Sequence, residues 1–251
     1  MKLGGKVAVV TGGGTGMGRA ICEGFAREGA RVVVNYNESA AAAGEVAEGI
    51  RAKGGEAVAV RASVAVDEEV RRMMRDTEER WGRLDILVNN AGWSKRTPHH
   101  LLEDLTEEIW DRTLNTNLRG AFYCMRAAAP LLRKQAGASI VNVASIAPYT
   151  GDGSTIVYAA SKAGLISMTK SFARVLAPEV RVNAIAPGLV HTRFAGWPPE
   201  TFVNGAAQAP LGRIATVEEV AAAALFLAAD ATAMTGETIK VDCGVIALRR
   251  A

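Results

Sequence analysis

Short runs of consecutive apolar, largely β-branched residues recur along the whole chain, separated by stretches of helical length. In Val7 to Val10 and in Ile86 to Val88, neighbouring side chains are apolar, and not only every second one. Strands with this pattern are buried on both faces, which is typical of a parallel sheet covered by helices. The pattern predicts seven strands, at residues 6–10, 31–35, 57–62, 84–89, 139–144, 180–185 and 237–241.

The intervening stretches predict about six helices, at residues 19–28, 40–53, 67–81, 106–135, 155–176 and 217–229. Thr216 and Glu219 form a capping-box pattern at the start of the last helix. No linker, internal repeat or break in composition divides the 251 residues. The sequence therefore predicts one doubly wound, Rossmann-type α/β domain over residues 1–251, with helices on both faces of the parallel sheet. Residues 189–212 carry prolines and aromatic side chains with few helix or strand signals, and we expect a mobile insertion that covers a site.

Composition excludes several classes of function. The 29 Lys and Arg residues nearly balance the 26 Asp and Glu residues, without a block of like charges, so no nucleic-acid partner is expected. The longest apolar run covers only residues 220–229, whereas a bilayer span needs roughly 20 residues, so no membrane association is expected. The three cysteines are widely separated, which fits neither a disulfide framework nor a zinc site, and no metal is expected from the three histidines. We expect a cytoplasmic protein with core thiols.

The first predicted strand ends in a glycine-rich turn, Thr11 to Gly18, with the pattern T-G-x-x-x-G-x-G. Between a buried strand and a helix, such a turn lets the backbone approach a pyrophosphate, while the helix N-terminus supplies N–H donors. The more common dinucleotide spacing G-x-G-x-x-G is absent, and a turn without a ligand is the alternative.

A second group of polar residues follows other strands. Tyr158 and Lys162 are four residues apart on a predicted helix, so the ammonium can favour the phenolate, although this spacing alone also arises by chance. Ser145, Asn89 to Gly92 and Pro187-Gly188 each follow a predicted strand. The carboxyl ends of the strands are where a doubly wound sheet holds its ligand, so we expect these residues at one edge.

In this combination and order, the motifs resemble those of the short-chain dehydrogenase/reductases, and most of all their 3-oxoacyl-[acyl-carrier-protein] reductase-like branch. The resemblance implies an NAD(P)(H)-dependent oxidoreductase that interconverts a ketone and a secondary alcohol by hydride transfer. It implies Tyr158 as general acid and base, with Lys162 and the oxidised nicotinamide lowering its pKa, and Ser145 as a donor to the substrate oxygen. Asn117 would anchor a water that relays protons to Lys162. The alternatives are a sugar or secondary-alcohol dehydrogenase of the same family and a non-catalytic dinucleotide-binding sensor or scaffold.

By the same resemblance, the end of the second strand selects the coenzyme. Tyr36 stands where NAD-dependent members carry an Asp, and Asn35, Asn37 and Ser39 supply neutral donors, which favours NADP(H) over NAD(H). Glu38 is interpreted as a first-turn helix charge. Ser63 replaces the Asp that touches adenine in the family. The full expected coenzyme set is Gly12, Thr15, Gly16, Met17, Gly18, Asn35, Tyr36, Asn37, Ser39, Ser63, Val64, Asn90, Ala91, Gly92, Tyr158, Lys162, Pro187, Gly188, Val190 and Thr192.

The substrate is the least defined part of the prediction. An apolar ketone or a 3-oxoacyl thioester is expected, in a pocket walled by Trp93, Ser94, Tyr149, Phe194 and Trp197. Basic residues on two helices form a candidate landing patch for an acidic acyl carrier protein, with ordinary solvated helix charge as the favoured alternative: Arg126, Arg133, Lys134 and Arg174. Cys243 replaces a family glycine and is expected to be buried. Small residues on the helix 155–176 predict close helix contacts. The family resemblance implies that the same helices of a second subunit make these contacts, and we expect a homotetramer, with a dimer as the alternative.

Overall fold

A computed structural model, which describes residues 1–248, contains one sheet of seven parallel strands in the order β3-β2-β1-β4-β5-β6-β7. The chain starts at the centre of the sheet, builds outward to β3 and then crosses back to β4, so the strand order reverses between β1 and β4. Such a switch point is where an open α/β sheet binds its ligand. The predicted fold class is confirmed. The strands are β1 (Val7–Val10), β2 (Arg31–Tyr36), β3 (Glu56–Arg61), β4 (Ile86–Asn89), β5 (Ala138–Val143), β6 (Val180–Pro187) and β7 (Thr238–Val241).

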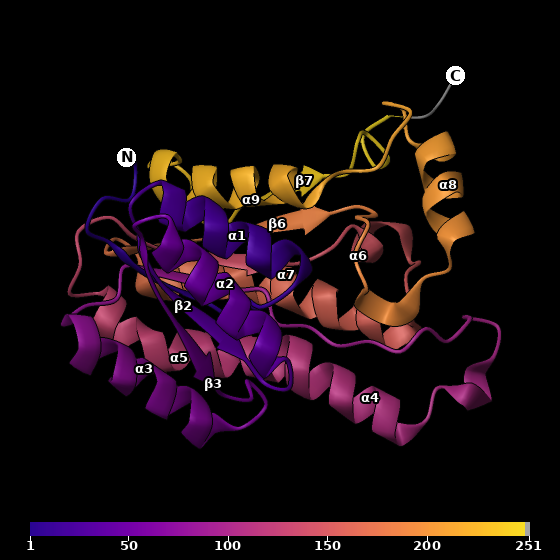
Figure 1. Ribbon diagram of the computed structural model, residues 1–251. Coiled ribbons are helices and arrows are strands. Elements are labelled where there is room, and N and C mark those ends of the chain that lie inside the picture. The colour runs from indigo at the N-terminus through magenta and orange to yellow at the C-terminus, as the bar shows by residue number, and fades with distance from the viewer. Residues whose placement is uncertain (249–251) are drawn as a thin grey trace.

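Helices cover both faces of the sheet (Figure 1). One layer contains α1 (Gly16–Arg27), α2 (Ala40–Ala52) and α9 (Val217–Leu225), and the other contains α3 (Asp67–Trp81), α5 (Gly120–Leu132) and α7 (Ile156–Leu176). Successive side chains of each strand point alternately toward the two helix layers. Ala8 and Val10 pack into the first core, whereas Val7 and Val9 pack into the second. This two-sided burial is why the strand sequences are apolar at consecutive positions.

The helix predicted at 106–135 is present from Glu107 to Leu132, but it contains a π-helical turn that the sequence did not predict. The structure has α4 (Glu107–Leu114), a π-helical turn at Asn115–Arg119 and then α5. A π turn accommodates one extra residue per turn and is frequent at functional sites. It rotates the following residues around the axis, and Asn117 is buried within it. A similar turn, Phe226–Asp230, follows α9.

Residues 189–212, which carry few helix or strand signals in the sequence, include two helical segments, and the mobility expected of this insertion stays a prediction. The insertion contains a short turn, Phe194–Gly196, and the helix α8 (Pro199–Gln208). Proline is tolerated at the first helical position because its missing N–H would have no intrahelical partner there; Pro199 therefore starts this helix. No residue of α8 is buried, and the helix stands apart from the sheet, above α6 (Ala147–Thr150) at its carboxyl edge (Figure 1).

The predicted capping box is confirmed by the structure, whereas the predicted burial of Cys243 is not. The capping box of α9 is present: Glu219 N donates to Thr216 Oγ1 at 3.2 Å, and Thr216 N donates to Glu219 Oε2 at 2.9 Å. Cys243, expected to be buried, is partly exposed and has a left-handed φ of +55°. Within residues 1–248, no helix combines the length and the apolar character that a membrane crossing requires.

Candidate active site

The glycine-rich turn after β1 needs glycine for steric reasons. Gly12 has φ +62°, and Gly16 has φ +52°. A Cβ at Gly18 would collide with the carbonyl oxygen of Gly12 and approach Asn90 Nδ2 within 2.5 Å. Asn90 Nδ2 itself donates to Thr11 O at 2.9 Å and to Gly12 O at 3.1 Å. The turn is thus a rigid, close-packed cradle tied to the loop after β4.

A cavity of about 1040 Å³ opens above this cradle. Its size and its glycine lining, with the N-terminus of α1 at the same place, fit a dinucleotide whose pyrophosphate needs close backbone approach. Most of the residues expected to bind the coenzyme lie in its wall. They are Gly12, Thr15, Gly16, Met17, Gly18, Ser39, Asn90, Ala91, Gly92, Tyr158, Lys162 and Thr192. Pro187, Gly188 and Val190 line an adjoining cavity.

Five expected coenzyme residues lie outside both cavity walls: Asn35, Tyr36, Asn37, Ser63 and Val64. Asn35 is buried beneath the turn, where Oδ1 accepts from Gly12 N at 3.3 Å and Nδ2 donates to Ala62 O at 2.9 Å. It positions the cradle and has no free face toward a ligand. Val64 is packed against Gly120. A strand-end position in the sequence does not reveal which way the side chain turns.

Helix α7 places Tyr158 and Lys162 at the cavity. Thr155 caps the helix, accepting from Tyr158 N at 2.9 Å. The i, i+4 spacing brings Lys162 Nζ to 5.7 Å from the centroid of the Tyr158 ring, and the ammonium donates to Val143 O at 2.7 Å. Lys162 is therefore fixed to the end of β5, beside Tyr158.

The two side chains have strongly displaced pKa values. Burial raises the pKa of Tyr158 to about 12, with the hydrogen bond to Ser145 acting in the opposite direction. Burial also lowers the pKa of Lys162 to about 8. The sequence led us to expect a depressed phenol pKa, but in the free chain burial outweighs the other influences. At neutral pH the phenol carries its proton.

Asn117 connects the loop after β4 to α7. Its Oδ1 accepts from Trp93 N at 2.7 Å, and its Nδ2 donates to Trp93 O at 3.0 Å and to Ser161 Oγ at 3.2 Å. Both N–H groups are used, so an ordered water could bond only to the remaining lone pair of Oδ1. The expected water relay stays a prediction, whereas the positioning of α7 is visible in these bonds.

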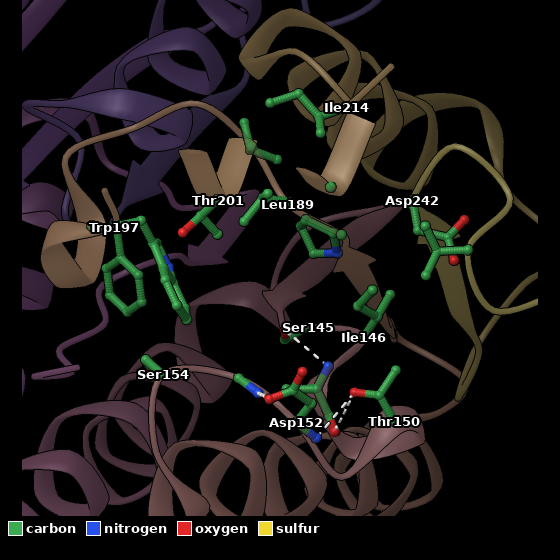
Figure 2. Close-up of a pocket in the computed structure, with 18 of the residues that line it drawn as sticks. Ser145, Ile146, Thr150, Asp152, Ser154, Leu189, Trp197, Thr201, Ile214 and Asp242 are labelled. Atoms are coloured by element: carbon green, nitrogen blue, oxygen red, sulfur yellow. Dashed lines mark hydrogen bonds between the residues drawn. The ribbon is translucent and has the colours of Figure 1, made fainter. Parts of the chain in front are cut away.

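The adjoining cavity, of about 740 Å³, is bounded by Ser145, the loop after β6 and α8. In Figure 2, Ser145 lies between Trp197 and Thr201 on one side and Asp242 on the other. Tyr158 borders both cavities, and the ring of Phe194 lies 5.6 Å from its ring. The phenol is thus at the junction of the dinucleotide cavity and a second, open cavity.

Two of the five residues expected to form the substrate wall line the second cavity. Phe194 and Trp197 line the second cavity, but Trp93, Ser94 and Tyr149 do not. Ser94 is buried in a 2.6 Å hydrogen bond with Ser154, and Tyr149 is 44% exposed. Other polar residues also line this cavity. Thr201, Asn204 and Gln208 belong to α8, a helix that the sequence did not predict, whereas Arg96 and His99 lie in the loop after β4 and Ser154 lies between α6 and α7.

Three of the four basic residues of the candidate landing patch are engaged with the protein. Arg126 pairs with Asp67 at 2.6 Å and Lys134 with Glu78 at 2.9 Å. Arg133 donates to Val175 O at 2.8 Å. These contacts favour the alternative of ordinary helix charge.

Comparison with known proteins agrees with this geometry. A family model described as enoyl-(acyl carrier protein) reductase matches residues 12–246. The 3-oxoacyl-[acyl-carrier-protein] reductase of Synechocystis sp. is 40% identical over 96% of this chain and 97% of its own. The 3-oxoacyl-[acyl-carrier-protein] reductase FabG of Staphylococcus aureus is 39% identical over 96% of this chain and 98% of its own.

A solved structure also has a similar fold. The Brucella melitensis protein described as a short-chain dehydrogenase/reductase, glucose/ribitol dehydrogenase, has a TM-score of 0.88 and 31% identity, covering 97% of this chain and 98% of its own. Fold, site motifs and relatives therefore coincide over nearly the whole sequence. This chain belongs to the short-chain dehydrogenase/reductase family, the NAD(P)-dependent oxidoreductases that act on carbonyl and alcohol groups.

Proposed function

We propose that this protein reduces the 3-oxo group of an acyl thioester to the 3-hydroxy group. The observation that carries the proposal is the position of Tyr158 at the border between the dinucleotide cavity and the second cavity. A proton donor at this border reaches a carbonyl oxygen held in the second cavity. The relatives named as 3-oxoacyl-[acyl-carrier-protein] reductases support this choice of substrate class.

In the reductive direction, the chain supplies orientation and a proton. Ser145 Oγ lines the second cavity and donates a hydrogen bond to the carbonyl oxygen, which becomes negative during reduction. Tyr158 Oη donates its proton to that oxygen, consistent with the phenol being protonated at neutral pH. Lys162, held by Val143 O, lies beside the phenol and stabilises the negative charge left on it. When bound, the reduced nicotinamide coenzyme supplies the hydride.

NADP(H) is our proposed coenzyme. Its 2′-phosphate needs hydrogen-bond donors at the loop after β2, and Asn37 and Ser39 supply neutral donors there, on either side of Glu38. For the assembly we propose a homotetramer, in keeping with the exposed apolar side chains Phe122, Ile156 and Val175 on α5 and α7. For the location we propose the cytoplasm.

The test is a panel of substrates given to the purified protein, with turnover measured as the loss of NADPH absorbance. The panel contains a 3-oxoacyl thioester, the matching 2-enoyl thioester, a simple secondary ketone and a ketose. We expect the highest kcat/KM with the 3-oxoacyl thioester, and a lower one with NADH in place of NADPH. Turnover of the enoyl thioester alone, or of none of the four, would refute the proposal.

A further inference from the structure

Arg112 contacts two loops that each contribute residues to the wall of the dinucleotide cavity. It lies on α4, far in sequence from the glycine-rich turn, yet its Nη2 is 3.2 Å from Glu38 Oε1 in the loop after β2. Its guanidinium carbon is also 4.6 Å from the centroid of the Trp93 ring, in the loop after β4. Arg112 therefore bridges two loops that leave the sheet on either side of β1.

Both anchor points adjoin the wall of the dinucleotide cavity. Glu38 is followed by Ser39, which lines the cavity, and Trp93 follows Gly92, which also lines it. The loop after β2 is where Rossmann-type proteins distinguish a ribose 2′-hydroxyl from a 2′-phosphate. The guanidinium of Arg112 thus contacts the loop where this choice is made.

The charges of the segments near the expected 2′-phosphate are relevant to the role of Arg112. Residues 37–45, which follow β2, contain Glu38 and Glu45 but no Lys or Arg, and the glycine-rich turn at 11–18 contains no charged residue. Neither segment therefore supplies a positive charge of its own to a 2′-phosphate. The cation must come from another element: Arg112, which already contacts Glu38, or Arg61, which is in register with Tyr36. The sequence analysis treated Glu38 as a helix charge and did not anticipate a partner from a different helix.

The contact with Glu38 is of the kind that a phosphate can replace. The two side chains are 45% and 74% exposed, and exposed ion pairs contribute little to stability. Arg binds phosphate oxygens through two parallel N–H donors, which makes a stronger contact than one N–H to a carboxylate in water. The Trp93 ring holds the guanidinium plane in place during such an exchange.

We propose that Arg112 is a coenzyme-specificity residue, which holds Glu38 in the free protein and pairs with the 2′-phosphate of NADP(H) when the coenzyme binds. The proposal rests on the dinucleotide-binding role of the cavity. It concerns the difference between NADPH and NADH and does not depend on the identity of the ketone.

The test is equilibrium binding of NADPH and NADH, measured by fluorescence titration without a substrate. For R112L, we expect the Kd for NADPH to rise about 10- to 100-fold, the effect of losing a charge-assisted hydrogen-bonded pair, and the Kd for NADH to change less than about twofold. For E38Q, we expect NADPH to bind about two- to fivefold tighter, because the 2′-phosphate no longer competes with a carboxylate for the Arg112 guanidinium. In the double variant, the gain from E38Q should shrink.

The matched control is R61L. Arg61 is the exposed last residue of β3, in register with Tyr36, and it forms no ion pair among residues 1–248. Its loss should change the NADPH-to-NADH ratio of Kd values less than about twofold. An equal effect of R112L on both coenzymes, or a selective loss of NADPH in R61L instead, would overturn the proposal. If the wild-type protein prefers NADH while R112L still weakens only NADPH, the NADP(H) preference fails and the role of Arg112 stands.

Discussion

At the scale of single residues, Lys162 lies beside Tyr158 at the candidate site, and burying its ammonium costs free energy of folding. It is 4% exposed, and burial lowers its pKa from 10.5 to about 8. A lysine with a lowered pKa disfavours the folded state wherever its unfolded form is protonated. Below pH 8 the folded chain must bury the full ammonium, and as pH rises from about 8 to 10.5 this cost disappears.

Replacing Lys162 with Met should therefore stabilise the fold while abolishing turnover. We expect the free energy of unfolding at pH 7 to rise by about 2 kcal/mol. Each unit by which burial lowers the pKa of Lys162 corresponds to about 1.4 kcal/mol, and about 1 kcal/mol is subtracted for the lost hydrogen bond to Val143 O. The gain should fade toward pH 10.5. Urea unfolding at both pH values measures it, with Lys170→Met on the exposed side of α7 as control. A Lys162→Met protein less stable than wild type at pH 7 would contradict this view.

At the scale of elements, the cradle depends on one close approach. A methyl group at Gly18 would meet the Gly12 carbonyl and the Asn90 amide, neither of which is the end of a flexible side chain free to move. Gly18→Ala should weaken NADPH binding at least about 100-fold, because the turn must open to accommodate it.

The control for this substitution lies on α2. Gly49→Ala would place a methyl group where no atom lies within 4 Å, in a helix interior, and should raise stability by about 0.5–1 kcal/mol without changing the Kd for NADPH. Fluorescence titration of both variants makes the comparison. Unaltered NADPH binding in Gly18→Ala would show that the turn is not the pyrophosphate site.

The insertion with α8 is the element that we expect to move. It contributes Phe194, Trp197 and Thr201 to the second cavity, but α8 has no buried residue to hold it there. Few buried contacts are the mark of segments that open locally. Hydrogen exchange of residues 191–210 should slow when NADPH and substrate are both present. Unchanged protection would argue against a lid.

The elements also show what sequence patterns can and cannot predict. Val7 to Val10 predicted a two-sided strand because burial on both faces leaves its mark at every position. Asn117 was identified, but its π turn was not, since one inserted residue leaves the apolar spacing almost unchanged. Trp93 was assigned to the substrate wall from its place after Gly92. The structure turns it toward Arg112, a direction set by a contact between distant segments.

At the scale of the whole molecule, the site is assembled from both halves of the sheet. The cradle comes from β1 and β4, whereas Ser145, Tyr158 and the insertion follow β5 and β6. The apolar side chains left exposed on α5 and α7, Phe122, Ile156 and Val175, lead us to expect association through these helices. Light scattering at micromolar concentration should give about four times the 26.4 kDa mass of the chain. A monomeric mass would rule out the proposed homotetramer.

The central claim is that Tyr158, placed where the two cavities meet, is the proton donor to a 3-oxoacyl thioester. The most direct measurement compares wild type and Tyr158→Phe for the rate of NADPH loss with that thioester, together with the Kd for NADPH. We predict a decrease in kcat of at least about 10²-fold with little change in Kd, because only the proton donor is removed. Near-normal turnover of the Phe variant would contradict the account.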